Sequence, residues 1–229
     1  VVGLIYTQHG NHDKALEYDL KSLEILKNVL DIDHPDTAIS YDNIGGVYTS
    51  KGDYDKALEY HLKALKIKEL VLGTDHPESY DNIGMVYNSK GDDDTALENF
   101  LKSLKIFENV LGTDHPSTAA RYNNIGFVCN SKGDYDNALE YLLKSLKIVE
   151  NVRGIDHPST AASYNNIGLV YNSKGDYDTA LEYHLKSLKI RENVLGTDHP
   201  DTATSYNNIG SVYDRKGDFD KALEYYFKS

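Results

Sequence analysis

Apolar residues recur along the chain in two stripes at helical spacing, separated by a short polar break. The first stripe has the i, i+3, i+4, i+7 spacing of one helix face and is clearest at Tyr164, Ile167, Gly168 and Tyr171. The second stripe, also at helical spacing, contains Tyr177, Ala180, Leu181, Leu188 and Ile190. In the break, Gly175 suits the left-handed residue that ends a helix, and Asp176 can cap the next one. The pattern predicts two helices joined by a tight turn.

This two-helix pattern repeats through the whole chain. The equivalent residues Tyr122, Tyr164 and Tyr206 lie 42 residues apart. All five prolines fall at one point of the repeat, before each first helix: Pro35, Pro77, Pro116, Pro158 and Pro200. A fixed period of this length indicates stacked two-helix units. We predict one all-α solenoid over residues 1–229, with six units of which the first and last are incomplete: 1–35, 36–77, 78–116, 117–158, 159–200 and 201–229.

One unit is out of register. Tyr80 follows Tyr41 by 39 residues, and the shortening falls between Pro77 and Tyr80, where HPESY replaces patterns such as HPSTAASY. Three residues make most of one helical turn. Either this first helix starts late, or three residues are missing from the sequence, and the pattern leaves both explanations open.

A glycine recurs inside every predicted first helix, although each costs about 1 kcal/mol relative to alanine there. The six positions are Gly3, Gly45, Gly84, Gly126, Gly168 and Gly210. Close approach of a neighbouring helix, where no side chain fits, explains such a choice. We expect the facing surface to come from small residues of the second helix, namely Ala57, Ala96, Ala138, Ala180 and Ala222.

The motif Tyr164-x2-Ile167-Gly168-x2-Tyr171, followed by Gly175, Ala180 and Ser187, resembles the tetratricopeptide repeat (TPR), with its W-x2-L-G-x2-Y start and later small residues. The period of 42, with LGTDHP between units, is similar to the variant found in kinesin light chains. Tyrosine replaces the usual tryptophan, and Cys129 stands where the other units have tyrosine. The resemblance covers the whole chain. It implies an all-α, right-handed α-α superhelix, a TPR solenoid, whose first helices line the concave side.

An asparagine occupies the same first-helix position in five units, at Asn43, Asn82, Asn124, Asn166 and Asn208. Asparagine is a middling-to-poor helix former, but its amide offers both a donor and an acceptor. The resemblance implies that this position faces the groove and hydrogen-bonds the backbone of a bound peptide. Alternatively, near-identical repeats share the residue through duplication alone.

Three positions after the asparagine the residue varies, being Leu4, Gly46, Met85, Phe127, Leu169 and Ser211 in successive units. Residues i and i+3 are neighbours on a helix, so both positions share a face. A constant amide beside a variable side chain suits selective peptide recognition. Alternatively, the residue varies simply because the position faces solvent. We predict a peptide-binding groove formed by the five asparagines with Met85, Phe127 and Leu169. The Lys and Arg residues with which one TPR group clamps carboxylates are absent from these positions.

The amino-acid composition excludes several classes of binding partner. The net charge of -12, from 36 Asp and Glu against 24 Lys and Arg, argues against nucleic acid or an anionic membrane as a ligand. The apolar runs are too short to span a bilayer. Cys129 is the single cysteine, which excludes an intrachain disulfide and fits a reducing compartment, so we predict a cytoplasmic protein.

The remaining candidate chemistry has simpler structural explanations. A histidine stands between an aspartate and each proline, at His34, His76, His115, His157 and His199. A metal site needs several ligands that converge on one ion, so a helix entry is the simpler interpretation. Burial explains Cys129 better than catalysis does. No nucleophile–base pair or phosphate loop stands out, and we predict no catalytic residue, metal or cofactor.

The sequence therefore predicts a protein–protein interaction module, not an enzyme, that binds a protein or peptide segment in its groove. One alternative is a structural, self-associating repeat array. Another is the sensing arm of a larger receptor or enzyme. Apolar residues at both ends of the sequence, such as Ile5 and Leu223, further predict end-to-end self-association, because a repeat cannot bury its apolar face alone.

Overall fold

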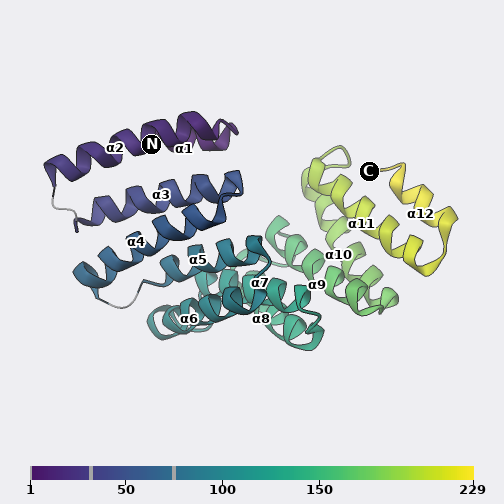
Figure 1. Cartoon of the computed structure of the whole chain (residues 1–229). Coiled ribbons are helices and arrows are strands. Elements are labelled where there is room, and N and C mark those ends of the chain that lie inside the picture. The colour runs from purple at the N-terminus through teal and green to yellow at the C-terminus, as the bar shows by residue number, and fades with distance from the viewer. Residues whose placement is uncertain (1, 31–32, 74–75) are drawn as a thin grey trace. The chain divides into compact units, whose positions relative to one another are not determined.

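The computed structural model describes residues 2–30, 33–73 and 76–229. Within these residues the chain forms helices and short connections, with no strand (Figure 1). The side chain of Leu4 lies outside the described part. The helices are α1 (Val2–Gln8), α2 (His12–Val29), α3 (Pro35–Lys51), α4 (Tyr54–Leu72), α5 (Pro77–Lys90), α6 (Asp93–Leu111), α7 (Pro116–Ser131), α8 (Tyr135–Arg153), α9 (Pro158–Lys174), α10 (Tyr177–Leu195), α11 (Pro200–Lys216) and α12 (Phe219–Tyr226).

The predicted turn chemistry is confirmed. After α9, Gly175 adopts a left-handed conformation with φ 87°, and the Asp176 side chain accepts a hydrogen bond from the backbone N–H of Thr179 at 3.2 Å. Before α9, the Nδ1 atom of His157 accepts from the backbone N–H of Ser159 at 3.0 Å, and Pro158 is the first helical residue. His34, His115 and His199 cap their helices in the same way. These histidines are therefore helix entries.

The shortened unit loses its residues from the helix itself. Helix α5 begins at Pro77, as the other first helices begin at their prolines, so it does not start late. It contains 14 residues, whereas α3, α9 and α11 each contain 17. His76 makes no side-chain cap hydrogen bond, unlike its counterparts. The shortening thus removes most of one turn and one helix cap.

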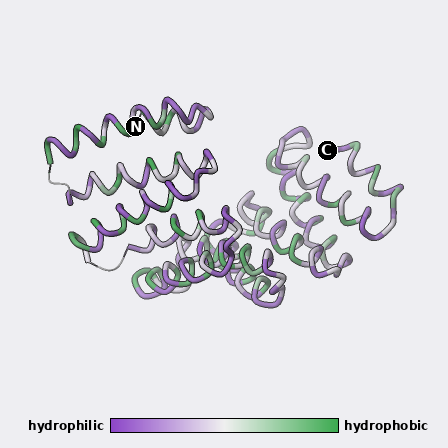
Figure 2. The backbone as a smooth tube through the Cα atoms, viewed as in Figure 1, coloured by the Kyte–Doolittle hydropathy of each residue, from purple (hydrophilic) through white to green (hydrophobic). Residues whose placement is uncertain are grey.

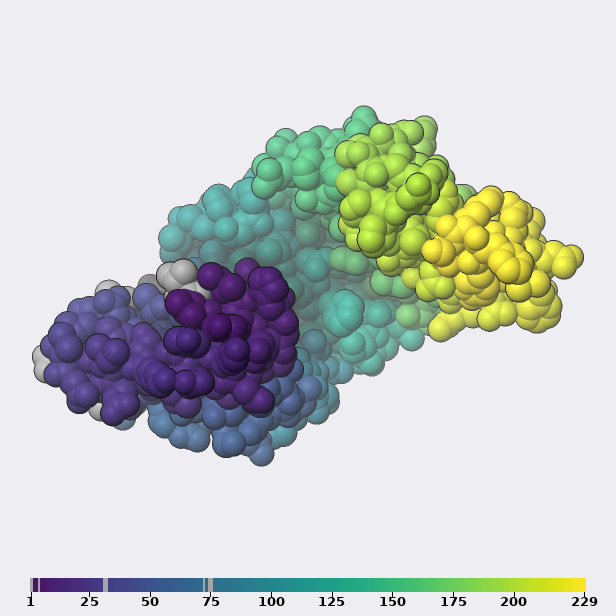
Figure 3. Space-filling model, turned by 90° about the horizontal axis from the view of Figure 1, so that it is seen from above, coloured from purple at the N-terminus to yellow at the C-terminus, as the bar shows by residue number. Residues whose placement is uncertain are grey.

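Two compact units make up the chain, residues 1–110 (unit 1) and 111–229 (unit 2), and each is described by itself. The single solenoid over residues 1–229 stays a prediction. Within each unit, consecutive helices pack against one another, and the colours of Figure 3 change gradually along each unit because neighbours in sequence are neighbours in space. First helices also contact first helices, α1 with α3 and α3 with α5 in unit 1, and α7 with α9 and α9 with α11 in unit 2. They form one continuous surface of each unit, the first-helix face.

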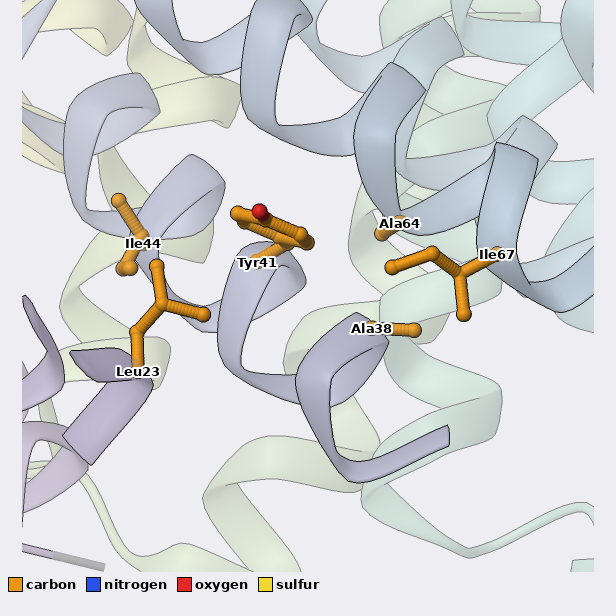
Figure 4. Close-up of a cluster of buried hydrophobic side chains, with 6 residues drawn as sticks. All are labelled: Leu23, Ala38, Tyr41, Ile44, Ala64 and Ile67. Atoms are coloured by element: carbon orange, nitrogen blue, oxygen red, sulfur yellow. The ribbon is translucent and has the colours of Figure 1, made fainter. Parts of the chain in front are cut away.

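Each unit is held together by small apolar clusters between successive helices. In unit 1, Leu23 of α2, Tyr41 and Ile44 of α3 and Ile67 of α4 pack together (Figure 4). In unit 2 the equivalent cluster joins α10 to α11 and contains Ala180, Leu181, Leu188, Tyr206, Ile209 and Val212. Apolar and polar segments alternate along the helices that can be followed in Figure 2, as expected when only one stripe of a helix is buried.

The helix-interior glycines lie at the predicted close approaches, but alanine side chains do not fill them. A methyl group added at Gly45 would lie 2.8 Å from the His61 ring, and one at Gly168 would lie 2.8 Å from the His184 ring. At Gly126 the nearest atom belongs to Leu142, at 2.7 Å, and the Ala138 backbone oxygen follows at 3.1 Å. The gap is therefore occupied by a large side chain one helical turn beyond the alanine.

Candidate functional site

The asparagines predicted to bind a peptide lie on the first-helix face, outside the core. Asn43 is exposed, and the others are half-buried: Asn82, Asn124, Asn166 and Asn208. The side chains predicted beside them are also accessible, since Met85 and Phe127 are each 52 % exposed. Leu169 is half-buried. Peptide binding at these residues stays a prediction.

In unit 2 the asparagines are joined to the preceding repeat. The side-chain N–H of Asn166 donates to Oδ1 of Asn123 at 2.8 Å, and that of Asn208 donates to Oδ1 of Asn165 at 2.8 Å. Each bond uses one amide hydrogen and leaves the amide oxygen and a second N–H for another partner. We call these bonds between successive repeats the asparagine ladder. The residue that precedes each groove asparagine is always Asp or Asn, and this periodicity is the sequence signal for the ladder: Asp42, Asp81, Asn123, Asn165 and Asn207.

A hollow of about 390 Å³ opens on the first-helix face of unit 1. Three of the predicted groove residues line it, namely Asn43, Asn82 and Met85. The rest of its wall comes from residues that sequence reasoning missed or did not assign to the groove: Thr7, Asp19, Asp42, Gly46, Val47, Thr49, Ser50 and His61. Because polar and apolar groups meet here in one concave surface, this hollow is the strongest candidate site of unit 1.

A buried ionic network forms the base of this hollow. Nδ1 of His61, a residue only 3 % exposed, lies 2.8 Å from a carboxylate oxygen of Asp42. Nζ of Lys68 donates to the second carboxylate oxygen at 2.7 Å and to Oγ of Ser79 at 3.1 Å. Burial alone would raise the pKa of Asp42, but the hydrogen bonds from His61 and Lys68 outweigh it and lower the pKa below its usual value. Asp42 is therefore an ionised and fully engaged acceptor.

Unit 2 has a smaller and more apolar hollow at the corresponding first-helix face. Phe127, Leu142, Leu169 and Val170 supply its apolar wall, and Asn130 and Asn166 its amides. The buried Oδ1 atom of Asn130 makes no hydrogen bond to a described residue. Asn124 and Asn208 lie on the same face outside this hollow. The two units thus offer different surroundings to a ligand.

Other candidates carry less chemistry. Cys129 is buried, and burial raises the pKa of its thiol, which disfavours the reactive thiolate. Among the described residues, no group of three or more His, Cys, Asp or Glu side chains could hold a metal ion. Within the same residues, no helix has the length and hydropathy needed to cross a bilayer.

Several solved structures have a similar fold. BtubC (BKLC) from P. vanneervenii has a TM-score of 0.78 at 23 % identity, over 93 % of this chain and 87 % of that chain. A putative kinesin light chain from Podosopora anserina with nearly identical TPR-like repeats has a TM-score of 0.74 at 22 % identity, over 85 % of this chain and 94 % of that one. The apo form of RapI has a TM-score of 0.71 at 18 % identity, over 99 % of this chain and 93 % of that one.

At these identities the likeness shows the fold alone, and it confirms the predicted all-α TPR solenoid with kinesin-light-chain-like repeats. No curated protein sequence matches the chain. The family model described as tetratricopeptide repeat matches residues 2–70, 75–130, 121–192 and 161–229. Because these matches cover nearly the whole sequence, the chain belongs to the tetratricopeptide repeat family.

Proposed function

We propose that this protein is an interaction module that binds an extended peptide segment of another protein along its first-helix face. Tetratricopeptide repeats generally form protein-interaction or scaffold surfaces, and the fold is typically non-catalytic. We propose further that the protein acts without catalysis, by binding alone.

One observation carries this proposal: polar amides with free hydrogen-bonding groups stand beside accessible apolar side chains on one continuous face. Asn166 keeps its Oδ1 and one N–H after bonding Asn123, and it lines the same hollow as Phe127 and Leu169. A peptide backbone needs both a donor and an acceptor, and its side chains need apolar recesses. The face supplies both at the spacing of the repeats.

Selection of a random peptide library against the full chain tests this function. Selected peptides are then measured by fluorescence anisotropy against wild type and the double variant Asn124→Ala/Asn166→Ala. We expect binding to weaken about thirtyfold, because two hydrogen bonds of about 1 kcal/mol each are lost. The matched control, Asn151→Ala/Asn193→Ala, changes exposed asparagines of the second helices α8 and α10 and should bind normally.

Equal affinity of both double variants for every selected peptide would contradict binding on this face. Sedimentation of the same samples over a range of concentrations measures the self-association predicted from the sequence. A protein that associates strongly with itself and selects no peptide would instead support the self-associating array.

A further inference from the structure

The hollow of unit 1 contains a carboxylate that no described residue neutralises. Asp19 of α2 is half-buried and lines the hollow, and its carboxylate makes no hydrogen bond or ion pair with a described side chain. Because the carboxylate is half-buried and poorly solvated, the pKa of Asp19 is raised above its usual value. Asp42, the other carboxylate of the hollow, is already paired with Lys68 at 2.7 Å. The hollow therefore keeps one carboxylate that no described side chain pairs with.

The hydroxyl groups around it are oriented as acceptors. Each donates its hydrogen to a backbone oxygen of its own helix: Thr7 to Gly3 at 3.1 Å, Thr49 to Gly45 at 3.0 Å, and Ser50 to Gly46 at 3.1 Å. A hydroxyl has one hydrogen to donate, so the oxygen lone pairs that remain can only accept. These three side chains thus offer acceptors to a ligand.

The buried histidine offers one acceptor more. A carboxylate can only accept, so the 2.8 Å contact of His61 with Asp42 requires the hydrogen to reside on Nδ1. In the neutral imidazole Nε2 then carries the lone pair. His61 is only 3 % exposed and lines the hollow, and no described residue hydrogen-bonds its Nε2. Apart from the amide groups of Asn43 and Asn82, the described polar side chains of the lining thus offer acceptors and no donors.

Apolar walls complete the hollow. Val47 and Met85 line it, and a methyl group added at Gly46 would meet no atom within 4 Å. The positions equivalent to Gly46 in unit 2 carry Phe127, Leu169 and Ser211, so the open space belongs to unit 1. A long side chain with an apolar stem and a polar head fits this combination of walls and acceptors.

We propose that the hollow of unit 1 receives a lysine or arginine side chain of the bound peptide, whose cationic head pairs with Asp19. The stem lies along Val47 and Met85 in the space left by Gly46. Lysine offers three N–H donors and arginine five, which matches a lining rich in acceptors. This inference rests on the proposed function, because it names the side chain by which a peptide on the first-helix face is chosen.

Peptides selected from the random library against the full chain test it. We expect the binders to share one basic residue, and its replacement by glutamine to weaken binding to wild type about tenfold or more. The Asp19→Asn variant should bind the basic peptide and its glutamine version with the same low affinity. Gly46→Leu, which fills the hollow, should lose binding although leucine favours the helix more than glycine does. Glu24→Gln, an equal charge change on an exposed residue of α2, should behave as wild type.

A second measurement uses Met85, the single methionine, as a reporter within the hollow. Its labelled methyl signal in NMR should shift with N-acetyl-arginine amide or N-acetyl-lysine amide and stay in place with the uncharged citrulline analogue. Peptides that bind wild type and Asp19→Asn equally, with no shift of the Met85 signal, would overturn this inference and leave peptide binding intact. If the library yields no peptide that binds, the proposed function is overturned. If the Met85 signal is then also unmoved by either cation, the inference is overturned as well.

Discussion

The two units hold a histidine at the same repeat position in opposite electrostatic settings. In unit 1, His61 of α4 lies 2.8 Å from the carboxylate of Asp42, which also accepts from Lys68 at 2.7 Å. The side chains of Asp42 and Lys68 are only 15 % and 17 % exposed. Unit 1 therefore buries an ion pair with its histidine attached.

In unit 2, His184 of α10 lies 3.1 Å from the amide oxygen of Asn165. Arg191 occupies the repeat position of Lys68. It donates instead to the backbone oxygen of Asp201 at 2.7 Å and to Oγ of Ser205 at 2.8 Å. Burial, and secondarily the positive charge of Arg191, lowers the pKa of His184 to about 4. The histidine of unit 2 is thus held neutral.

The difference teaches that one position decides the character of the face while the backbone stays the same. Asp42 and Asn165 have nearly the same shape, and each approaches Nδ1 of its histidine through one oxygen. Only the carboxylate can also neutralise a lysine. A repeat family can therefore alter the chemistry of its groove without altering its fold, by exchanging a carboxylate for an amide.

The largest expected effect separates the two settings directly. Asp42→Ala strands the buried Lys68 and should cost about 3 to 5 kcal/mol of unfolding free energy. Asn165→Ala removes only neutral hydrogen bonds and should cost about 1 to 2 kcal/mol. Native-state hydrogen exchange of α3–α5 and of α9–α11 measures each loss locally. Equal losses in both units would show that the ion pair of unit 1 adds nothing.

The second effect is a loss of stability on mild acidification, which we expect in unit 2. The folded-state pKa of His184 is about 4 and its ordinary value is 6.5, so the unfolded state binds more protons between these values. Unit 2 should therefore lose stability as the pH falls from 6.5 towards 4, by roughly 3 kcal/mol in all. The pKa of Asp42 is instead lowered below 3.8, so its stabilisation persists until the pH falls below that value.

Hydrogen exchange of both units across this pH range gives the measurement. The control is His184→Leu, which copies Leu142, the residue at the same position of the preceding repeat. This variant should abolish the loss between pH 6.5 and 4 in unit 2. The idea fails if unit 1 weakens over the same range as unit 2.

The third effect contrasts two adjacent glycines of α3. Gly45→Ala places a methyl group 2.8 Å from the His61 ring, which Asp42 holds in place, and should cost about 1 to 3 kcal/mol. Gly46→Ala meets open space and should stabilise the helix by about 1 kcal/mol. Thermal unfolding of the two variants, whose compositions are identical, decides between them. A higher melting temperature for both variants would show that the His61 ring moves aside without cost.

Much of this fold could be predicted from the sequence, because its determinants are local and repeated. Gly175, Asp176 and Pro158 mark the ends of their helices whatever lies around them, and the period fixes which helices are neighbours. The close approach at Gly45 was also predictable, but not the ring that fills it. His61 lies 16 positions along the chain, and its placement depends on how α3 and α4 pack.

The candidate site was predictable only in part for the same reason. The asparagines follow from periodicity, whereas the hollow of unit 1 depends on the packing of five helices, α1 to α5. Asp19, Asp42 and His61 come from α2, α3 and α4, and nothing in the local pattern marks Asp19 as a carboxylate with no described side-chain partner. The useful sequence signal for such a site is a residue that departs from the repeat. Asp19 is a carboxylate, whereas the equivalent positions carry His61, Phe100, Leu142, His184 and Tyr226.

The smallest expected effect concerns the asparagine ladder. Asn166→Ala removes the 2.8 Å bond to Asn123 and should destabilise unit 2 by about 1 kcal/mol. Asn82 occupies the same repeat position in unit 1 but makes no hydrogen bond to a described residue, and Asp42 of the preceding repeat is engaged by His61 and Lys68. Asn82→Ala should therefore leave the stability of unit 1 nearly unchanged.

Urea denaturation followed by hydrogen exchange resolves a difference of this size when both variants are compared with Asn151→Ala, an exposed residue of α8. If Asn82→Ala costs as much as Asn166→Ala, Asn82 has a structural partner in solution and its amide is not free. If the expected difference is found, the asparagines of unit 2 serve stability and recognition together. Asn82 would then serve recognition alone, and its loss should weaken peptide binding without weakening the fold.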